Sequence, residues 1–389
     1  MPDTSAIDRV LSDAVTSGQV PGVVAVAANA SGPIYQGAFG RRSLAADQAM
    51  TVDTVFRIAS MTKAVTGAAV MQLVEQGRIG LDQPAEEILP MLKGRQVLDG
   101  FDAAGKPILR PMKGTITLRN LLTHTAGFVY DTWNGTMNRY AAETGLPAAR
   151  TQQLKALSAP LGFDPGTRWE YGINIDIAGY MIDVLLKTTL ETYMQDHLLG
   201  PLGMADTSFV PGPRLLPRLA SVHTRDANGT LTAFDAPLPP PNGEFFAGGG
   251  GLFSTAPDYL RFLRALMAGG ELDGKRVLKP ETVALMSQNN MSELNVLPLP
   301  TFNPRMSNPV DLYPDQQLKW GLSFLINTRD VPGRRSAGSL AWAGINNTYY
   351  WLDPTKKIAG VLMTQVLPFA DNTVLGLLDR FEAAVYAAA

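Results

Sequence analysis

A serine and a lysine three residues apart are the first side chains in the chain that suggest chemistry. Ser60 and Lys63 form the only Ser-x-x-Lys of the sequence. A serine hydroxyl attacks a carbonyl once a neighbouring group takes its proton, and a neutral amine between apolar walls can do this. By spacing alone, a helix-capping serine and a solvated lysine explain the pair as well. Further motifs elsewhere in the chain must therefore decide between the catalytic and the structural explanation.

The residues after this pair predict a buried helix. Residues 64–77 are apolar nearly all round and end in Gly77, a common helix stop. Ser60 would then lie at the helix N-terminus, with Lys63 one turn later on the same face. The partial positive charge of a helix N-terminus stabilises an alkoxide or oxyanion formed there. A lysine inside so apolar a helix start favours a chemical use of its amine.

Composition narrows the class of protein. The chain has 389 residues, of which 46% are hydrophobic and 17% charged, as in a well-packed enzyme. A net charge of -2 gives no electrostatic reason to expect nucleic acid or an anionic membrane as a partner. The chain has no cysteine and only three histidines, so we expect no disulfide, thiolate zinc site or histidine-rich metal site. We expect no metal and no cofactor.

The sequence also shows no pattern that is typical of a targeting signal. The first residues lack the basic and apolar regions of a signal peptide, and no run of about 18 apolar residues could span a membrane. We therefore expect a cytoplasmic protein with no membrane association. The oligomeric state does not follow from the sequence.

Periodicity predicts strands at both ends of the chain and helices in between. Residues 22–28 and 34–39 have the pattern of paired strands, and residues 348–352 and 358–364 that of a hairpin. Residues 7–15 and the stretch from Thr373 have helical spacing, while residues 80–220 show short helices and loops with few strand signals. We expect an α/β fold, with a discontinuous α/β domain (1–79 and 221–389), a helical subdomain (80–220) and the active site between them.

Three separated motifs then come into register. They are Ser60-x-x-Lys63, Tyr171 in the sequence Trp-Glu-Tyr-Gly, and Trp342-Ala343-Gly344 just before the last hairpin. Together with residues 121–127 and the glycine run 248–251, their order and spacing resemble the serine β-lactamase and penicillin-binding-protein superfamily. Within it, the chain is most similar to class C β-lactamases and to the family VIII carboxylesterases. The resemblance covers essentially the whole chain and implies a β-lactamase-like antiparallel sheet flanked by helices, with an inserted helical subdomain.

The resemblance also assigns roles. It implies that Ser60 is the acylated nucleophile, Lys63 its proton acceptor or electrostatic partner, and Tyr171 the second acid/base. The oxyanion hole would use the backbone N–H groups of Ser60 and of Ile345, which follows Trp342-Ala343-Gly344 on an edge strand. Asp176 and Asn174, just after Tyr171, would line the site.

Two departures from class C β-lactamases bear on the substrate. Those enzymes carry Lys-Thr-Gly where this chain has Trp342-Ala343-Gly344, and asparagine where it has Ile173. A lysine ammonium pairs with a substrate carboxylate, whereas an indole offers one N–H and a large apolar face. We expect a mostly apolar pocket for a neutral ester. Its candidate walls are Trp342, Gly344, Tyr130, Trp133, Asp176, and Phe245 or Phe246; the plain alternative is that some of these rings are ordinary core.

The rival serine-hydrolase layout does not fit. An α/β-hydrolase needs a Gly-x-Ser-x-Gly elbow and a late histidine, but the chain has no such motif and its last histidine is His223. We interpret His124 as structural.

The sequence thus predicts a serine carboxylesterase that cleaves short- to medium-chain esters through a Ser60 acyl-enzyme, with a small-molecule ester as its partner. The first alternative is a class C-type β-lactamase or D-alanyl-D-alanine peptidase, with Arg334 or Arg335 holding a carboxylate and permitting weak cephalosporin turnover. An acyltransferase or amide-oligomer hydrolase on the same fold stays open. A catalytically silent binding module also stays open, although the set of Ser60, Lys63 and Tyr171 speaks against it.

Overall fold

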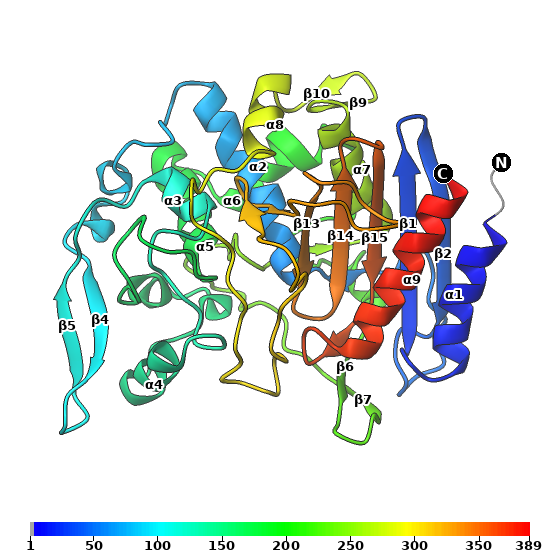
Figure 1. Cartoon of the computed structure of the whole chain (residues 1–389), viewed down its shortest axis with the longest axis horizontal. Helices are drawn as coiled ribbons and strands as arrows, with labels where there is room; N and C mark the ends of the chain where they lie inside the picture. The colour runs from blue at the N-terminus through cyan, green and yellow to red at the C-terminus, as the bar shows by residue number, and fades with distance from the viewer. Residues whose placement is uncertain (1–3) are drawn as a thin grey trace.

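A seven-stranded antiparallel sheet organises the molecule, which is described here over residues 4–389 of a computed structural model (Figure 1). The strand order is β11-β12-β13-β14-β15-β1-β2. The strands of this sheet are β1 (Gly22–Asn29), β2 (Gly32–Gly40), β11 (Lys319–Trp320), β12 (Leu325–Ile326), β13 (Leu340–Gly344), β14 (Thr348–Asp353) and β15 (Ile358–Met363). The first and last parts of the chain meet where β1 pairs with β15, with Val24 opposite Met363.

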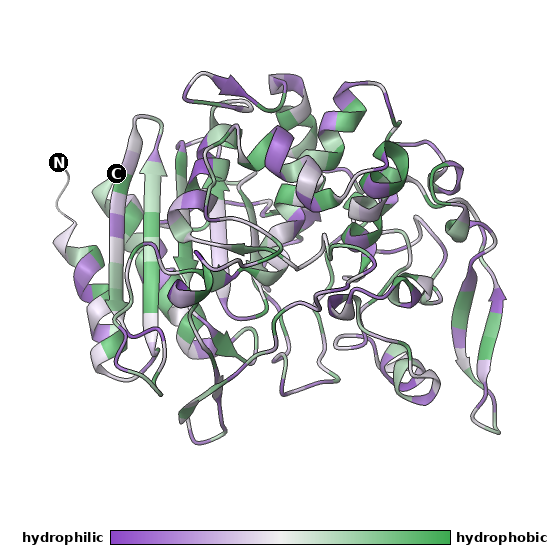
Figure 2. Ribbon diagram, turned by 180° about the vertical axis from the view of Figure 1, so that it is seen from behind, coloured by the Kyte–Doolittle hydropathy of each residue, from purple (hydrophilic) through white to green (hydrophobic). Residues whose placement is uncertain are grey.

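The central strands are fully buried because both faces of the sheet are covered. Every residue of β14 and β15 is buried, which requires packing on both sides rather than an alternating pattern. Helices α1 (Ser5–Thr16) and α9 (Asn372–Ala388) cover one face, and α7 (Ala256–Met267) packs on the other against β1 and β15. The hydropathy colouring of Figure 2 shows green, hydrophobic stretches in the strands of the sheet that lie near the two chain termini.

Helix α2 (Thr62–Glu75) lies between the sheet and a second group of helices (Figure 1). It is buried continuously from Thr62 to Leu73, as its nearly all-round apolar sequence predicts. Gly77, with φ of 67°, follows its end in the left-handed conformation that favours glycine. The helices beyond α2 are α3 (Leu118–Leu122), α4 (Gly135–Thr144), α5 (Asn174–Leu186) and α6 (Leu190–Met194).

Several further elements are short. They are β3 (Phe56–Arg57) paired with β8 (Phe253–Ser254), β9 (Glu271–Leu272) with β10 (Lys275–Arg276), β6 (Val222–Arg225) with β7 (Leu231–Phe234) and β16 (Val366–Leu367), and helix α8 (Pro280–Met286). The β3–β8 pair ties the chain just before Ser60 to the end of the glycine-rich stretch.

The expected strands and helices are confirmed at both ends of the chain. The predicted hairpin is β14–β15, the strands predicted over 22–39 are β1 and β2, and the terminal helices are α1 and α9. The division into a discontinuous α/β part and a helical part remains our interpretation of these layers.

Two details of the prediction are wrong. The segment 80–220 contains a strand hairpin, β4 (Gln96–Phe101) with β5 (Pro107–Pro111), which projects at the outer edge of the molecule (Figure 1). Strand β13 is also not an edge strand, because β12 pairs with its first two residues, Leu340 and Ala341. From Trp342 onward β13 pairs only with β14 among the described strands, so this half has one open side.

Candidate active site

Ser60 lies in a single 3₁₀ turn, Ala59–Met61, immediately before α2. The preceding residue, Ala59, has φ of 43°, a conformation that non-glycine residues rarely adopt and that tends to occur at functional sites. Strand β13 comes close to this turn: a Cβ on Gly344 would lie 2.3 Å from the carbonyl oxygen of Ile58. Glycine at 344 therefore lets the chain leading to Ile345 pass beside Ser60. Gly344 therefore has a packing role, and its expected contact with substrate stays a prediction.

Lys63 is fully buried, and its amine has three neighbours. Its Nζ lies 3.1 Å from Ser60 Oγ, 3.1 Å from the hydroxyl of Tyr130 and 2.5 Å from the carbonyl oxygen of Gly249. These partners match the three N–H donors of an ammonium group. Only the Gly249 carbonyl is restricted to accepting, whereas the two hydroxyls can also donate. In the neutral amine, the lone pair can therefore face Ser60 or Tyr130.

Tyr171 completes the group from the side of the second helical layer. Its ring centroid lies 4.8 Å from Lys63 Nζ, and its hydroxyl accepts a hydrogen bond from the indole Nε1 of Trp342 at 2.9 Å. The rings of Tyr171 and Trp342 are 5.0 Å apart. The structure thus brings together Ser60, Lys63, Tyr171 and Trp342 from three distant parts of the chain.

Tyr130 has a position that the sequence did not reveal. It was expected only as a pocket wall, but its hydroxyl accepts from Lys63. Burial raises the pKa of Tyr130 well above its usual range, and the charges of Asp176 and Tyr171 add to this. Its backbone N–H donates to the carbonyl oxygen of Tyr171 at 3.1 Å, which ties the two tyrosine loops together. No motif surrounds Tyr130 that could have marked it.

Asp176 and Asn174 lie in the first turn of α5 and are both buried. Asp176 Oδ1 accepts from the Gly249 N–H at 2.9 Å, and burial raises the pKa of this carboxyl group although Lys63 opposes the shift. Asn174 donates to the carbonyl oxygen of Phe128 and contacts His124 Nδ1 at 3.1 Å. We therefore expect neither side chain to contact substrate, contrary to the sequence-based hypothesis.

His124 is structural, as its place in the sequence suggested. It is fully buried, and its Nδ1 lies 3.4 Å from the backbone N–H of Gly172. Burial lowers the pKa of His124 well below its usual range, and the charge of Lys63 lowers it further. The ring is therefore neutral, and it packs against Tyr171 at 4.7 Å.

The aromatic cluster differs in part from the expected pocket. Tyr130, Trp133 and Trp342 each contact the Tyr171 ring, with centroids 5.0 to 5.3 Å apart. Phe245 instead pairs with Tyr180, and Phe246 with Phe209, so among the described residues neither ring joins the cluster. The expected place of a phenylalanine from this segment in the substrate pocket stays a prediction.

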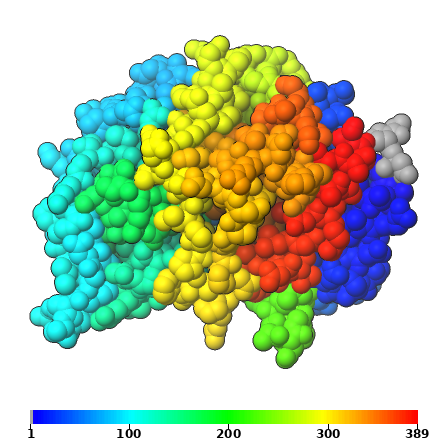
Figure 3. All heavy atoms as spheres, viewed as in Figure 1, coloured from blue at the N-terminus to red at the C-terminus, as the bar shows by residue number. Residues whose placement is uncertain are grey.

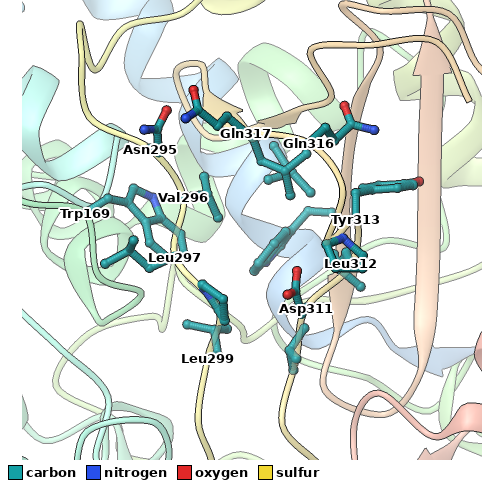
Figure 4. Close-up of a pocket in the computed structure, with 16 residues that line it drawn as sticks. Trp169, Asn295, Val296, Leu297, Leu299, Asp311, Leu312, Tyr313, Gln316 and Gln317 are labelled. Carbon is teal, nitrogen blue, oxygen red and sulfur yellow. The ribbon is translucent and has the colours of Figure 1, made fainter.

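A pocket of about 260 Å³ lies beside Trp342 (Figure 4). Two arms of one long loop form its sides: residues 295–299 on one side and 310–318 on the other, bridged where Leu299 faces Val310. Its walls are mostly apolar, with Trp169 and Trp342 among them and four polar side chains at Asn295, Asp311, Gln316 and Gln317. In the space-filling view, the segment between α8 and β13 covers the middle of the molecule over this region (Figure 3).

The two arginines considered as carboxylate ligands are already paired. Arg335 is buried and makes a bidentate contact with Glu382 of α9 at 2.8 and 2.6 Å. Arg334 pairs with Asp379 on the same helix. Arg335 is therefore not available to a substrate carboxylate, and this part of the β-lactamase alternative loses its support.

Residues 4–389 contain no group of three or more histidine, aspartate or glutamate side chains placed to hold a metal ion. None of the helices in the same range combines the length and apolarity needed to cross a membrane.

Comparison with known proteins places this geometry in context. The sequence pattern of the family described as Beta-lactamase matches residues 7–384. The chain is 33% identical to the ML-236A carboxylate methylbutanoyltransferase mlcH of Penicillium citrinum, over 98% of this chain and 94% of that protein. It is 30% identical to the lovastatin esterase of Penicillium rubens, over 98% of both chains.

A solved structure shares the whole architecture. The unliganded simvastatin synthase LovD from Aspergillus terreus superposes with a TM-score of 0.84 at 31% identity, covering 100% of this chain and 99% of that one. Similarity to acyltransferases is therefore as extensive as similarity to an esterase. A specific link to family VIII carboxylesterases is not among these findings.

Proposed function

The chain belongs to the beta-lactamase family and is a serine hydrolase or acyltransferase of β-lactamase-like α/β fold; from this we propose that it is a carboxylesterase acting through a Ser60 acyl-enzyme. The observation that carries the proposal is the position of Lys63 Nζ, 3.1 Å from both Ser60 Oγ and the Tyr130 hydroxyl. A buried amine at this distance can receive the serine proton directly.

In the acylation step, Ser60 Oγ attacks the ester carbonyl carbon while its proton moves to the neutral Lys63 amine. The oxyanion is held by the backbone N–H groups of Ser60 and Ile345. The bond to the leaving alcohol breaks, and Tyr171 donates its proton to the departing oxygen. The Trp342 N–H, 2.9 Å away, stabilises the resulting phenolate.

Deacylation reverses these proton movements. The Tyr171 phenolate takes a proton from an incoming water molecule, whose oxygen attacks the acyl carbon. The bond to Ser60 Oγ then breaks, and Lys63 returns its proton to that oxygen. The enzyme is restored with no net change in protons, and neither metal nor cofactor takes part in these steps.

A neutral, largely apolar substrate fits this site better than a carboxylated one. The indole of Trp342 stands where class C β-lactamases carry a lysine, and Arg335 is bound to Glu382. The neighbouring pocket of about 260 Å³ has mostly apolar walls. A small apolar pocket of this kind favours the hydrocarbon part of an ester.

Transfer of the acyl group to an alcohol is a second candidate function. Relatives that match 98% of the chain are named for transfer of a methylbutanoyl group, and another is named an esterase. The same apolar pocket could hold the hydrocarbon part of an acceptor alcohol and compete with water for the acyl-enzyme.

The experiment is an ester panel with and without an alcohol acceptor, using the wild type and Ser60→Ala. We expect Ser60→Ala to lose turnover by roughly a thousandfold or more and to lose labelling by a fluorophosphonate. Ser12→Ala, which removes an exposed hydroxyl on α1, is the matched control. Full turnover in Ser60→Ala would overturn the proposal. The ratio of free acid to transferred ester distinguishes hydrolase from transferase.

A further inference from the structure

Asp176 is a carboxylate in the interior that the reaction steps above do not use. It is 1% exposed and lies in the first turn of α5. Its Oδ1 accepts from the Gly249 N–H at 2.9 Å, and its carboxyl group also has the Tyr130 hydroxyl as a hydrogen-bonding neighbour. A carboxylate is costly to bury even when it is partly hydrogen-bonded, so its place in the interior calls for a reason beyond packing.

Gly249 connects this carboxylate to the catalytic lysine. Its N–H binds Asp176, and its carbonyl oxygen accepts from Lys63 Nζ at 2.5 Å. A Cβ on residue 249 would lie 2.2 Å from Asp176 Oδ2, so the carboxylate occupies the space that any side chain at 249 would need. The neighbouring Gly248 carbonyl accepts from Thr66 Oγ1 at 2.7 Å, which anchors the loop to α2 one turn beyond Lys63.

The charged and titratable groups around Asp176 come from three sides. Lys63 faces it from α2, Tyr130 from the loop before α4, and Gly249 offers only backbone. His124, whose ring is neutral, lies beyond Asn174. Lys63 is therefore the group that becomes positively charged next to this carboxylate when it accepts a proton, and Tyr130 is an acid whose ionisation the carboxylate opposes.

We propose that Asp176 is a positioning residue for Lys63, an inference that rests on the proposed function. Through Gly249 it holds a carbonyl against the amine, so that the lone pair of neutral Lys63 is turned toward the Ser60 hydroxyl. Its negative charge also stabilises the ammonium that forms when Ser60 gives up its proton. Asp176 itself touches neither the substrate nor the reacting atoms.

Asp176→Asn separates charge from shape, because the amide oxygen still accepts from Gly249 while the charge is lost. We expect kcat to fall about ten- to a hundredfold, the range for a misaligned catalytic group, with KM for a neutral ester changed less than about twofold. Removing the negative charge disfavours the Lys63 ammonium, so the acidic limb of the pH profile of kcat/KM should move to lower pH. A purely structural residue would not move that limb.

Asp183→Asn is the matched control, since it also removes a half-buried carboxylate from α5, but one that accepts from the Leu190 N–H rather than from the Gly249 loop. It should leave both kcat and the pH profile unchanged. If Asp176→Asn does not fold, Gly249→Ala serves instead: its methyl group must displace the loop, so kcat should fall while the acidic limb stays in place. Wild-type kcat in either folded variant overturns the inference.

The outcomes keep this inference separate from the proposed function. If Ser60→Ala remains active, the proposed function fails whatever Asp176→Asn does. If Ser60→Ala is inactive while Asp176→Asn keeps wild-type kcat and pH profile, only the positioning role fails. Complete labelling of Asp176→Asn by a fluorophosphonate, at a reduced rate, would support the role, because it shows an intact nucleophile with weakened activation.

Discussion

The indole Nε1 of Trp342 lies 2.9 Å from the hydroxyl oxygen of Tyr171 and donates a hydrogen bond to it. An indole cannot accept in return, so the tyrosine proton is directed to another partner. Trp342 therefore does more than replace a cation with an apolar surface. In the proposed mechanism, it orients Tyr171 and stabilises the charge that Tyr171 acquires on protonating the leaving group.

Trp342→Phe tests this relationship, because phenylalanine keeps a ring but has no N–H. A hydrogen bond to a charged group contributes roughly 1.5–3 kcal/mol, so kcat should fall about ten- to a hundredfold. Trp320→Phe is the control: its indole donates to the Leu122 carbonyl at 3.2 Å rather than to Tyr171. Steady-state kinetics on one neutral ester should show the loss in the first variant alone. An equal loss in both would assign the effect to packing.

Trp342→Lys tests the substrate preference. An ammonium at this position would offer a charge-assisted partner to a carboxylated substrate, typically about ten- to a hundredfold in specificity. We expect the ratio of cephalosporin to neutral-ester kcat/KM to rise, measured with a chromogenic cephalosporin. The ratio is the quantity of interest, because loss of the indole leaves a cavity that affects both reactions. A flat ratio in a folded variant would contradict the proposed place of Trp342.

The buried pair of Arg335 and Glu382 predicts a stability effect away from the site. Their side chains are 4% and 1% exposed, and removing one partner leaves an uncompensated buried charge. Arg335→Met should lower the free energy of unfolding by about 3–5 kcal/mol, measured by urea denaturation. The double variant with Glu382→Leu should recover part of this loss.

The control for that measurement is Arg276→Met, since Arg276 forms an exposed pair with Glu271. Exposed ion pairs contribute roughly 0–1 kcal/mol, so this variant should be close to the wild type. If Arg335→Met and Arg276→Met lose the same free energy of unfolding, burial of the Arg335–Glu382 pair does not explain the loss.

Asp183 predicts a dependence of stability on pH. Burial raises its pKa to about 7, against the opposing hydrogen bond from the Leu190 N–H. The folded state then holds this proton more tightly than the unfolded state, so the contribution to stability is greatest below about pH 4 and declines as pH rises toward 7. Asp183→Asn cannot ionise. At pH 8 it should be more stable than the wild type by about 1–2 kcal/mol, and at pH 4 nearly equal to it.

Thermal denaturation of both proteins between pH 4 and pH 8 measures this difference. A constant difference across the range would contradict the assignment, because it would show that ionisation of Asp183 is not the cause.

Local sequence patterns determine much of the fold. The all-round apolar run after Lys63, the glycine that ends it and the alternating strands near the C-terminus are short-range signals, and α2 and the β14–β15 hairpin confirm them. The β4–β5 hairpin does not follow from the sequence, because polar residues, glycine and proline interrupt its strands and only Val97 and Leu98 are buried. The predicted edge position of β13 is wrong because β12 has only two residues, too few for a periodic pattern.

The chemistry of single residues is also readable from the chain. Ser60 lies in the 3₁₀ turn that leads into α2 and Lys63 in the first turn of α2, so local helical geometry sets their separation without help from distant segments. The loss of a strand lysine at Trp342 is visible in the same way, as a departure from a known motif.

Contacts between distant segments are decided only by the tertiary structure. Tyr130, Asp176 and Gly249 surround Lys63 from three loops and helices whose sequences carry no shared motif. The Tyr171–Trp342 hydrogen bond joins positions 171 residues apart. Distances of this kind depend on how the helices pack against the sheet. That packing depends in turn on the side-chain volumes along the whole helix–sheet interface. A linear sequence specifies those volumes but not the arrangement in which they fit together.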